Sequence, residues 1–268
     1  MSSLPTRGIV LTFDNLGEAA ALERGTWEPN VPIGCDRSVT EALPWLLNEL
    51  DGRGLTATFF VEAINCELNP GAVREIADRG HELGVHGWRH EPWAALACDD
   101  ERALLERGRE AFGRLGLQAG AFRPPGGEPT PNTPRLLAEL GFKWWSPAAD
   151  AGDGESDGAA HGPPRIPFGW ELVDAYHLMD RFAPLRRRRG DPSAPQAPAA
   201  IAERFAARLQ RDRDGVQTMI LHPFLMLDPA WAAGVRGLLA LLAAIRDQGR
   251  AWVGPGGPLA ARTRELRA

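Results

Sequence analysis

Short apolar segments alternate with helix-like segments along most of this chain, and that alternation is what most constrains its fold. The first apolar segment, Gly8 to Phe13, is expected to be a buried strand that ends at Asp14. Further strands are expected over residues 56–61, 83–85, 120–123, 141–146, 217–221 and 251–253. Strands that alternate with helices in this way predict one α/β domain with a parallel sheet.

The segments between these strands have the spacing of amphipathic helices. Helices are expected over residues 39–50, 70–79, 99–115, 133–140, 199–211 and 229–248. Residues 165–168 and 172–177 fit either strands or an irregular rim. Residues 184–198, which include the run from Arg186 to Arg189, are expected to form an exposed loop. Because no repeat or linker interrupts the pattern, we expect a single domain over 1–268, with a motif-bearing core at 8–223 and a C-terminal helix and tail at 224–268.

Composition and charge narrow the possible partners. A net charge of −5 gives no reason to expect a nucleic acid. Three widely spaced cysteines are typical of free thiols in a reducing compartment. The first residues lack the apolar stretch of a signal peptide, and the longest apolar run, near Leu238 to Ile245, is too short to span a bilayer. These features predict a cytoplasmic protein with a small-molecule substrate and no membrane partner; the sequence leaves the oligomeric state open.

Polar residues follow several of the expected strands. Asp14, His86, Arg123, Asp150 and His222 all lie at or soon after a strand end. In parallel α/β folds, the carboxyl ends of the strands meet at one edge, where active sites form. We therefore expect these five side chains to converge on one site.

Two histidines, His86 and His90, are four residues apart, so they would project to the same side if the segment turned helically. Two imidazoles placed in this way can bind one divalent ion such as zinc, nickel or cobalt. Pro92 follows where a helix commonly begins. The spacing alone fits a metal site, but it also fits two histidines in the core or on the surface.

Five motifs together resemble the polysaccharide deacetylase family, also called the NodB-homology family or carbohydrate esterase family 4. They occur in family order over residues 8–223. The fourth motif is a loose match. The motifs are Thr12-Phe13-Asp14-Asn15, His86-Gly87-Trp88-Arg89-His90, Phe122-Arg123-Pro124-Pro125-Gly126, Trp144-Trp145 through Asp150, and Leu221-His222-Pro223.

This resemblance implies a distorted (β/α)7 barrel, a divalent metal (most often zinc, with cobalt or nickel as alternatives) and hydrolysis of an amide bond, typically an N-acetyl group on a sugar. Carried over by position, His86 and His90 are metal ligands and Asp14 is the catalytic base. His222 is the general acid, and Arg123 orients the base, alone or with Asp150. Asp153 and Asp157 compete with Asp150 in the same loop.

The chain departs from the family pattern at Asn15, where the family has a metal-ligating aspartate. A neutral amide oxygen is a poorer ligand for a dication than a carboxylate. Three outcomes are open. Asn15 ligates weakly, or Asp14 moves to the metal and leaves the base role to Glu62 or Glu128, or the site is inactive. We favour a working site with Asp14 in contact with the metal or its water.

For substrate contacts, Pro124, Trp88 and Trp145 are the candidates, among six tryptophans in or near the expected site loops, including Trp170. The run of arginines from Arg186 to Arg189 is expected to be a solvated loop. The expected activity is deacetylation of a small soluble N-acyl sugar or N-acylated intermediate. A cyclic imide or ureide hydrolase is an alternative, and Asn15 makes a catalytically degenerate carbohydrate-binding protein a third hypothesis.

Overall fold

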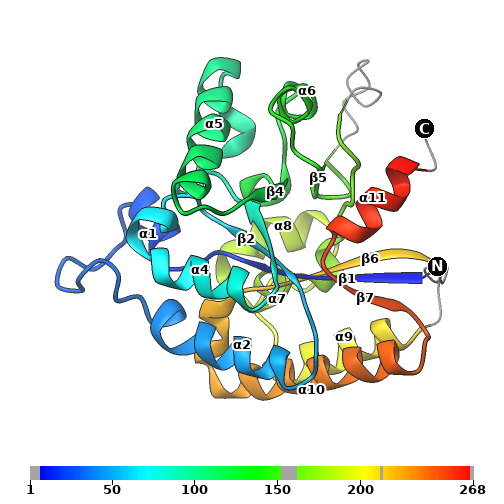
Figure 1. The fold of residues 1–268 in the computed structure, drawn as a ribbon. Coiled ribbons are helices and arrows are strands. Elements are labelled where there is room, and N and C mark those ends of the chain that lie inside the picture. Colours follow the sequence, from blue (N-terminus) through cyan, green and yellow to red (C-terminus); the bar gives the residue numbers. More distant parts are fainter. Residues whose placement is uncertain (1–6, 152–161, 212–213, 266–268) are drawn as a thin grey trace.

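A parallel sheet forms the centre of the molecule in the computed structural model, which describes residues 7–151, 162–211 and 214–265 (Figure 1). The strand order is β5-β4-β3-β2-β1-β6, and β7 also pairs with β1. Every strand pairing is parallel. The strands are β1 (Arg7–Asp14), β2 (Thr58–Val61), β3 (Glu82–Val85), β4 (Ala119–Phe122), β5 (Trp144–Trp145), β6 (Gly215–Leu221) and β7 (Trp252–Gly254).

The sheet curls into an incomplete barrel. On one side β1 pairs with β6 along its length; on the other it pairs first with β7 and then with β2. No regular strand joins β5 to β6 in the described residues. Instead, residues 165–173 cross this gap through isolated bridges between Trp145 and Arg165, Ala148 and Phe168, and Val173 and Ile220. The expected barrel-like fold class is therefore confirmed. Of the two segments that fitted either strands or a rim, 165–168 is an irregular rim, whereas 172–177 lies mostly in helix α7 (Asp174–Leu178), contrary to the prediction.

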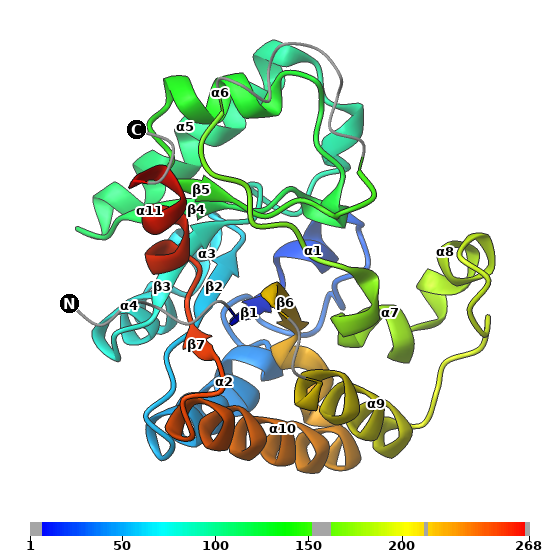
Figure 2. The ribbon, with the colours of Figure 1, turned by 90° about the vertical axis from the view of Figure 1, so that its right-hand side faces the viewer.

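Helices surround the sheet. Figure 2 shows α2, α9 and α10 along one side of the central strands, with α5 and α6 on the opposite side. The helices are α1 (Ala19–Glu23), α2 (Leu43–Asp51), α3 (Asn65–Leu68), α4 (Pro70–Asp78), α5 (Cys98–Arg114), α6 (Thr133–Glu139), α7 (Asp174–Leu178), α8 (Ala183–Arg188), α9 (Pro198–Gln210), α10 (Pro229–Asp247) and α11 (Gly257–Glu265). Short 3-10 or π turns are η1 (Ser38–Ala42), η2 (Trp93–Ala95), η3 (Pro125–Gly127), η5 (Trp170–Leu172), η6 (Asp180–Phe182) and η7 (Pro223–Leu227).

The two faces of β1 explain how the fold positions a site. Successive strand side chains point to opposite faces. Ile9, Leu11 and Phe13 belong to the main apolar core. Val10 belongs to a separate cluster that also contains Phe60 and Trp144. The same alternation puts Thr12 and then Asp14 on the Val10 face, so the last residue of β1 faces the interior of the half-barrel.

Two further sequence-based expectations about secondary structure are wrong. The segment expected to be a loop at 184–198 begins with α8, and an unexpected helix, α11, follows β7. In α8, the fully buried side chain of Arg186 donates hydrogen bonds to the backbone carbonyl oxygens of Tyr176, Met179 and Ser193. A run of four arginines predicted solvent exposure, but the guanidinium of Arg186 hydrogen-bonds α8 to the neighbouring backbone.

Among the described helices, α10 alone is long and apolar enough to cross a membrane by length and composition. The apolar run is longer than expected because alanines and glycines extend it beyond Leu238 to Ile245. In this structure α10 buries residues such as Trp231, Val235 and Leu242, and it packs against α9, α2 and β7. Such packing is that of a core helix.

Candidate active site

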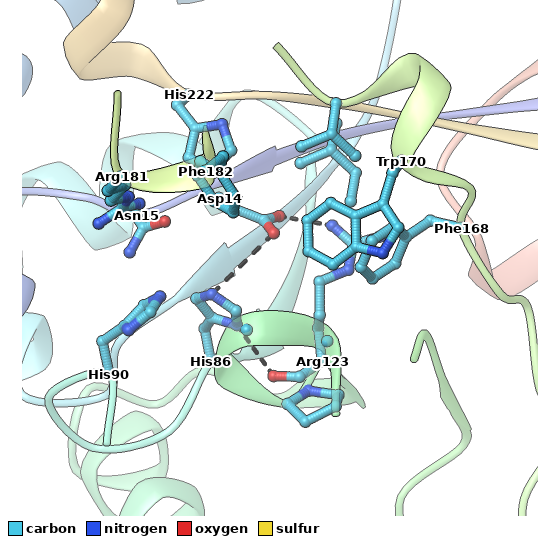
Figure 3. Close-up of a pocket in the computed structure, with 15 residues that line it drawn as sticks. Asp14, Asn15, His86, His90, Arg123, Phe168, Trp170, Arg181, Phe182 and His222 are labelled. Atoms are coloured by element: carbon cyan, nitrogen blue, oxygen red, sulfur yellow. Dashed lines mark hydrogen bonds and ion pairs between the residues drawn. The ribbon is translucent and has the colours of Figure 1, made fainter. Parts of the chain in front are cut away.

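The cavity at the carboxyl edge of the sheet brings together most of the residues expected from the sequence. It is lined by the expected residues Asp14, Asn15, His86, His90, Arg123, Pro124 and His222, and it holds about 100 Å³ of solvent-accessible space. Figure 3 shows these side chains pointing toward one another from different strands and loops. The tertiary structure therefore brings the strand ends together, as the sequence predicted.

Asp14 is held by a buried arginine. Its Oδ1 accepts a hydrogen bond from Nη1 of Arg123 at 2.5 Å, and both side chains are almost inaccessible to solvent. Arg123 also donates to the Thr12 hydroxyl at 2.9 Å and to the Ser146 hydroxyl at 2.8 Å. The guanidinium carbon lies 4.1 Å from the centre of the Phe60 ring. This fixed arginine leaves Oδ2 of Asp14 turned toward His86, at 4.0 Å from its Nε2.

The two histidines of the second motif lie on a loop and not on a helix, contrary to the geometry assumed for their spacing. After β3 the chain turns at Gly87, with a φ of 72°, and again at His90, with a φ of 76°. The Glu91 carboxylate accepts hydrogen bonds from the backbone N–H groups of Trp88 and Arg89 at 2.9 and 2.8 Å. This turn brings the two imidazole centroids to 5.0 Å. Glu91 is therefore a positioning residue that the sequence analysis did not identify.

The tautomer of His86 is set by a backbone contact. Its Nδ1 lies 2.9 Å from the carbonyl oxygen of Arg123, so Nδ1 carries a hydrogen and Nε2 presents its lone pair to the cavity. Burial lowers the pKa of His86 to about 3 and holds the pKa of His90 well below its ordinary value. Both imidazoles are consequently neutral, which is the form that binds a metal.

Asn15 contacts a buried carboxyl group, that of Glu62. Nδ2 of Asn15 donates to Oε1 of Glu62 at 2.5 Å, and the backbone N–H of Leu16 donates to Oε2 at 3.1 Å. Asn15 itself has a φ of 61°, a conformation that asparagine tolerates. Burial raises the pKa of Glu62 to about 8. The glutamate thus lies beside the position where the family has an aspartate.

The residues present fit a divalent cation. One ligand atom each from Glu62, His86 and His90 lies within 4.8 Å of the other two. Oδ1 of Asn15 is buried and has no hydrogen-bond partner among the described residues. Buried polar atoms are nearly always satisfied, so an acceptor left unpaired beside two neutral imidazoles and a carboxylate is what a bound cation would complete. Mixed nitrogen and oxygen donors suit zinc, cobalt or nickel.

His222 is positioned by an aspartate that the sequence analysis did not single out. Oδ1 of Asp174 lies 2.5 Å from Nδ1 of His222, and Oδ2 accepts from the backbone N–H of His222 at 2.9 Å. Nε1 of Trp231 donates to the same Oδ2 at 3.2 Å. Asp174 directly follows Leu172 and Val173, and Val173 bridges to β6. An acidic residue placed after this short apolar pair is the sequence feature that could have identified it as a site residue. This contact leaves Nε2 of His222 free for the cavity.

Several expected contacts do not form. Asp150 pairs with Arg189 and accepts from Nε1 of Trp170, so it does not orient Arg123. Its competitors Asp153 and Asp157 lie outside the described residues. Glu128 lines a neighbouring cavity, not this one.

The aromatic wall also differs from the expectation. Trp88 and Trp145 are buried in the main core, and Arg107 stacks on the Trp88 ring at 3.6 Å, so neither tryptophan lines the cavity. Trp170, Phe168 and Phe182 line it instead, and Figure 3 shows Trp170 and Phe168 across the cavity from His86 and His90. Trp88 and Trp145 each follow or end a strand, but their rings point into the core. Whether such a ring lines the cavity depends on the direction in which the side chain points, which the position in the sequence does not determine.

The protein is an α/β half-barrel. Its cavity lies at the carboxyl edge of a curled parallel sheet and is lined by histidines and carboxylates from the strand ends. The family model for polysaccharide deacetylases matches residues 2–145, more than half of the chain, and the chain therefore belongs to that family.

Known proteins resemble the chain in sequence and in structure. It is 34% identical over 103 residues to a peptidoglycan-N-acetylglucosamine deacetylase of Bacillus cereus, covering 38% of each protein. It is 30% identical over 95 residues to the corresponding Listeria monocytogenes protein, covering 35% of this chain and 20% of that protein. These matches span well under two thirds of the relatives' length. A solved Mycobacterium smegmatis chain whose name assigns it to the polysaccharide deacetylases superimposes with a TM-score of 0.82 at 29% identity, covering 99% of this chain and 94% of that one.

Proposed function

We propose that this chain hydrolyses the amide bond of an N-acyl group, such as an N-acetyl group on an amino sugar, with a divalent cation at the site. The observation that carries the proposal is the meeting of a carboxylate and a histidine, each fixed by its own buried partner, at one cavity beside the histidine pair. Membership of the polysaccharide deacetylase family and the names of the Bacillus and Listeria relatives support it.

His86, His90 and Glu62, with Oδ1 of Asn15, would hold the cation. A bound cation would polarise the amide carbonyl as a Lewis acid and lower the pKa of a water molecule toward ~7. Zinc is the first choice, and cobalt or nickel are alternatives, because the donors are a mixture of imidazole and oxygen groups.

The chain's own residues supply the proton transfers. Oδ2 of Asp14, the oxygen not held by Arg123, accepts a proton from the attacking water. The oxygen of that water forms a bond to the carbonyl carbon. His222, as an imidazolium whose Nδ1–H is held by Asp174, delivers its Nε2 proton to the amide nitrogen as the C–N bond breaks, while Asp14 keeps the proton taken from the water. The products are a carboxylic acid and an amine, and positioned acid–base groups of this kind contribute about 10²–10⁴ to the rate.

We further propose that the substrate is a small soluble compound and that the protein acts in the cytoplasm. The first proposal follows from the second, because a protein in the cytoplasm meets small soluble N-acyl compounds and not extracellular polymers. Three free cysteines support the second, since unpaired thiols are typical of reducing compartments.

The test is a release assay for the carboxylate product on N-acetylglucosamine, chitooligosaccharides, polymeric peptidoglycan, and cyclic imides and ureides, with zinc, cobalt or nickel added. We expect acetate release from a small N-acetyl compound, and a loss of about 10²-fold or more in kcat for Asp14→Asn. Asp99→Asn, an exposed carboxylate in the first turn of α5, is the matched control.

Alternative outcomes of this assay separate the hypotheses. Activity on polymer with none on small amides would overturn the small-substrate proposal. Hydrolysis confined to cyclic compounds would favour the imide or ureide reaction. Sugar binding without hydrolysis of any compound, in protein loaded with metal, would identify a carbohydrate-binding protein.

A further inference from the structure

Two arginines from distant parts of the chain place positive charge on the His90 side of the cavity, although only Arg181 lines it. Arg181, in η6, lines the cavity next to Phe182, and Figure 3 shows it close to Asn15 and His222. Arg24 ends α1. Both positive charges act on His90, and the charge of Arg24 acts on Arg181. The positive charge of Arg24 therefore opposes that of Arg181.

Neither guanidinium has an acidic partner in the described part of the chain, and this distinguishes them from the arginines around them. Arg123 pairs with Asp14, Arg189 with Asp150 and Arg208 with Glu171. Arg181 contacts only an aromatic face, with its guanidinium carbon 5.1 Å from the centre of the Phe182 ring. Burial, and then the charge of Arg24, lowers the pKa of Arg181 to about 10.

The remaining charges at the cavity do not balance this pair. Asp14 is neutralised by Arg123, and Asp174 lies against His222. Glu62 has its pKa raised to about 8 by burial and lies behind Asn15. A divalent cation at the histidines would add positive charge. The charge of Arg181, partly desolvated at the cavity and opposed by that of exposed Arg24, is unfavourable unless an anion binds it.

We propose that Arg181, assisted by Arg24, binds an anionic group of the substrate, so that the preferred substrates are N-acylated compounds carrying a carboxylate or a phosphate. This inference rests on the proposed amide hydrolysis and narrows its substrate class. A guanidinium offers a planar fork of donors that matches the oxygens of a carboxylate or phosphate. Phe182 provides apolar surface beside Arg181, and Trp170, whose ring centre lies 5.8 Å from that of Phe182, continues this surface across the cavity for the body of the substrate.

The position of the arginines sets where the anion lies. Arg181 is on the same side of the cavity as His90, whereas Trp170 and Phe168 line the wall near Arg123. An anion on Arg181 would leave the acyl group between Asp14 and His222. The charged group therefore stays on the amine product, and the uncharged acyl group is the part released as a carboxylic acid.

The experiment compares substrates that share one amide and differ in charge. The neutral probe is N-acetylglucosamine, the carboxylate probe is N-acetylmuramic acid, and the phosphate probe is N-acetylglucosamine 6-phosphate. We expect kcat/KM to be at least about tenfold higher for one of the anionic probes, mainly through KM, and this preference to fall as salt is added. The more reactive anion identifies which of the two groups is bound.

The variants Arg181→Gln and Arg24→Gln remove the charges one at a time. Each should lower the ratio of kcat/KM for the anionic probe to that for the neutral probe, by about tenfold for Arg181→Gln and less for Arg24→Gln. Arg187→Gln is the matched control, since Arg187 is an exposed arginine of neighbouring α8 that lines neither described cavity. It should keep the wild-type ratio.

Equilibrium binding of the same probes, measured by calorimetry, separates this inference from the proposed reaction. If no probe is hydrolysed but the anionic probe binds more tightly than the neutral one, and Arg181→Gln abolishes the difference, the anion site stands and the reaction is wrong. If the probes are hydrolysed or bound without regard to charge, or if Arg187→Gln has the same effect as Arg181→Gln, the anion site is wrong. Failure of every probe to bind also overturns it.

Discussion

Among single residues, Glu62 matters most for the position where the chain has Asn15 and the family has an aspartate. The Asn15 amide turns its donor to the glutamate and leaves its oxygen without a partner among the described residues. A carboxylate is thereby retained within reach of both histidines, although it comes from the end of β2 and not from the end of β1. Glu62 is protonated near neutrality because burial raises its pKa to about 8, and it becomes a ligand only when a bound cation displaces that proton.

A charge exchange between these two residues tests that reading. Glu62→Gln should weaken zinc binding by about tenfold or more, because the one carboxylate among the ligand atoms becomes neutral. The double variant Asn15→Asp with Glu62→Gln should regain most of the affinity, since the carboxylate returns at position 15 and the glutamine can donate to it. Affinity is measured by competition with a chelator.

The control for the charge exchange is Glu128→Gln, an exposed carboxylate that lines the neighbouring cavity and should leave zinc affinity unchanged. Unaltered affinity in Glu62→Gln, with the fold intact by circular dichroism, would remove Glu62 from the metal site.

His81 makes a second residue-scale prediction, about stability and pH. Burial lowers its pKa to about 4 from 6.5, and its Nε2 has no partner among the described residues. A histidine with a lowered folded-state pKa contributes stability that is fully present above about pH 6.5 and is lost as the pH falls toward 4. The difference between the two pKa values corresponds to about 3 kcal/mol.

The variant His81→Gln removes this titration. Between pH 7.5 and pH 4.5, wild type should lose up to about 3 kcal/mol more unfolding free energy than the variant, as measured by urea unfolding. Parallel pH curves for the two proteins would show that His81 is not buried in its neutral form.

At the scale of elements, the loop after β3 is the part of the site with the most specific backbone. A Cβ on Gly87 would lie 2.6 Å from Oε2 of Glu91 and 3.0 Å from Cγ of Pro125, and the residue has a φ of 72°. Both the contact and the φ favour glycine. The same loop carries both histidines, so its conformation determines whether the imidazoles can share one ion.

Gly87→Ala should destabilise the protein by about 1–3 kcal/mol and weaken zinc binding, because the loop must shift to admit the methyl group. Gly71→Ala is the control: it lies in α4, where a Cβ would meet no atom within 4 Å. That variant should be neutral or slightly stabilising by thermal unfolding. Wild-type zinc affinity in Gly87→Ala would show that the loop adapts.

At the scale of the whole molecule, α10 links the C-terminal region to the site. The helix packs against α9, α2 and β7, and Trp231 at its start donates to the aspartate that holds His222. β7 in turn pairs with β1, the strand that carries Asp14. The region after residue 223 therefore belongs to the same packed core as the motifs.

Leu239 of α10 is fully buried, so Leu239→Ala should cost about 2–5 kcal/mol of unfolding free energy. If residues 1–268 form one cooperative domain, the transition seen by tryptophan fluorescence, to which Trp170 at the cavity contributes, should shift to lower denaturant. The transition seen by far-ultraviolet circular dichroism of the helices should shift with it. Two separate transitions, with only one of them moved, would divide the chain into independent units. Leu241→Ala, at a less buried position of the same helix, should cost less.

The sequence by itself determined the alternation of strands and helices and the polar residues at strand ends. Both follow from local chemistry, since apolar periodicity selects each element and a parallel arrangement brings the ends to one edge. Thus Asp14, His86, His90, Arg123 and His222 could be assigned from the chain, and so could their family.

Only the tertiary structure decided the partners of these residues. Asp174, and not Asp150, lies against a site residue, because the irregular rim delivers it beside His222. Trp170 lines the cavity and Trp88 does not, because the direction of a loop side chain depends on what packs against it. Glu62 lies against Asn15 because the neighbouring strands β1 and β2 end side by side. Local sequence fixes what each residue can do, while packing over long chain separations fixes which residues meet.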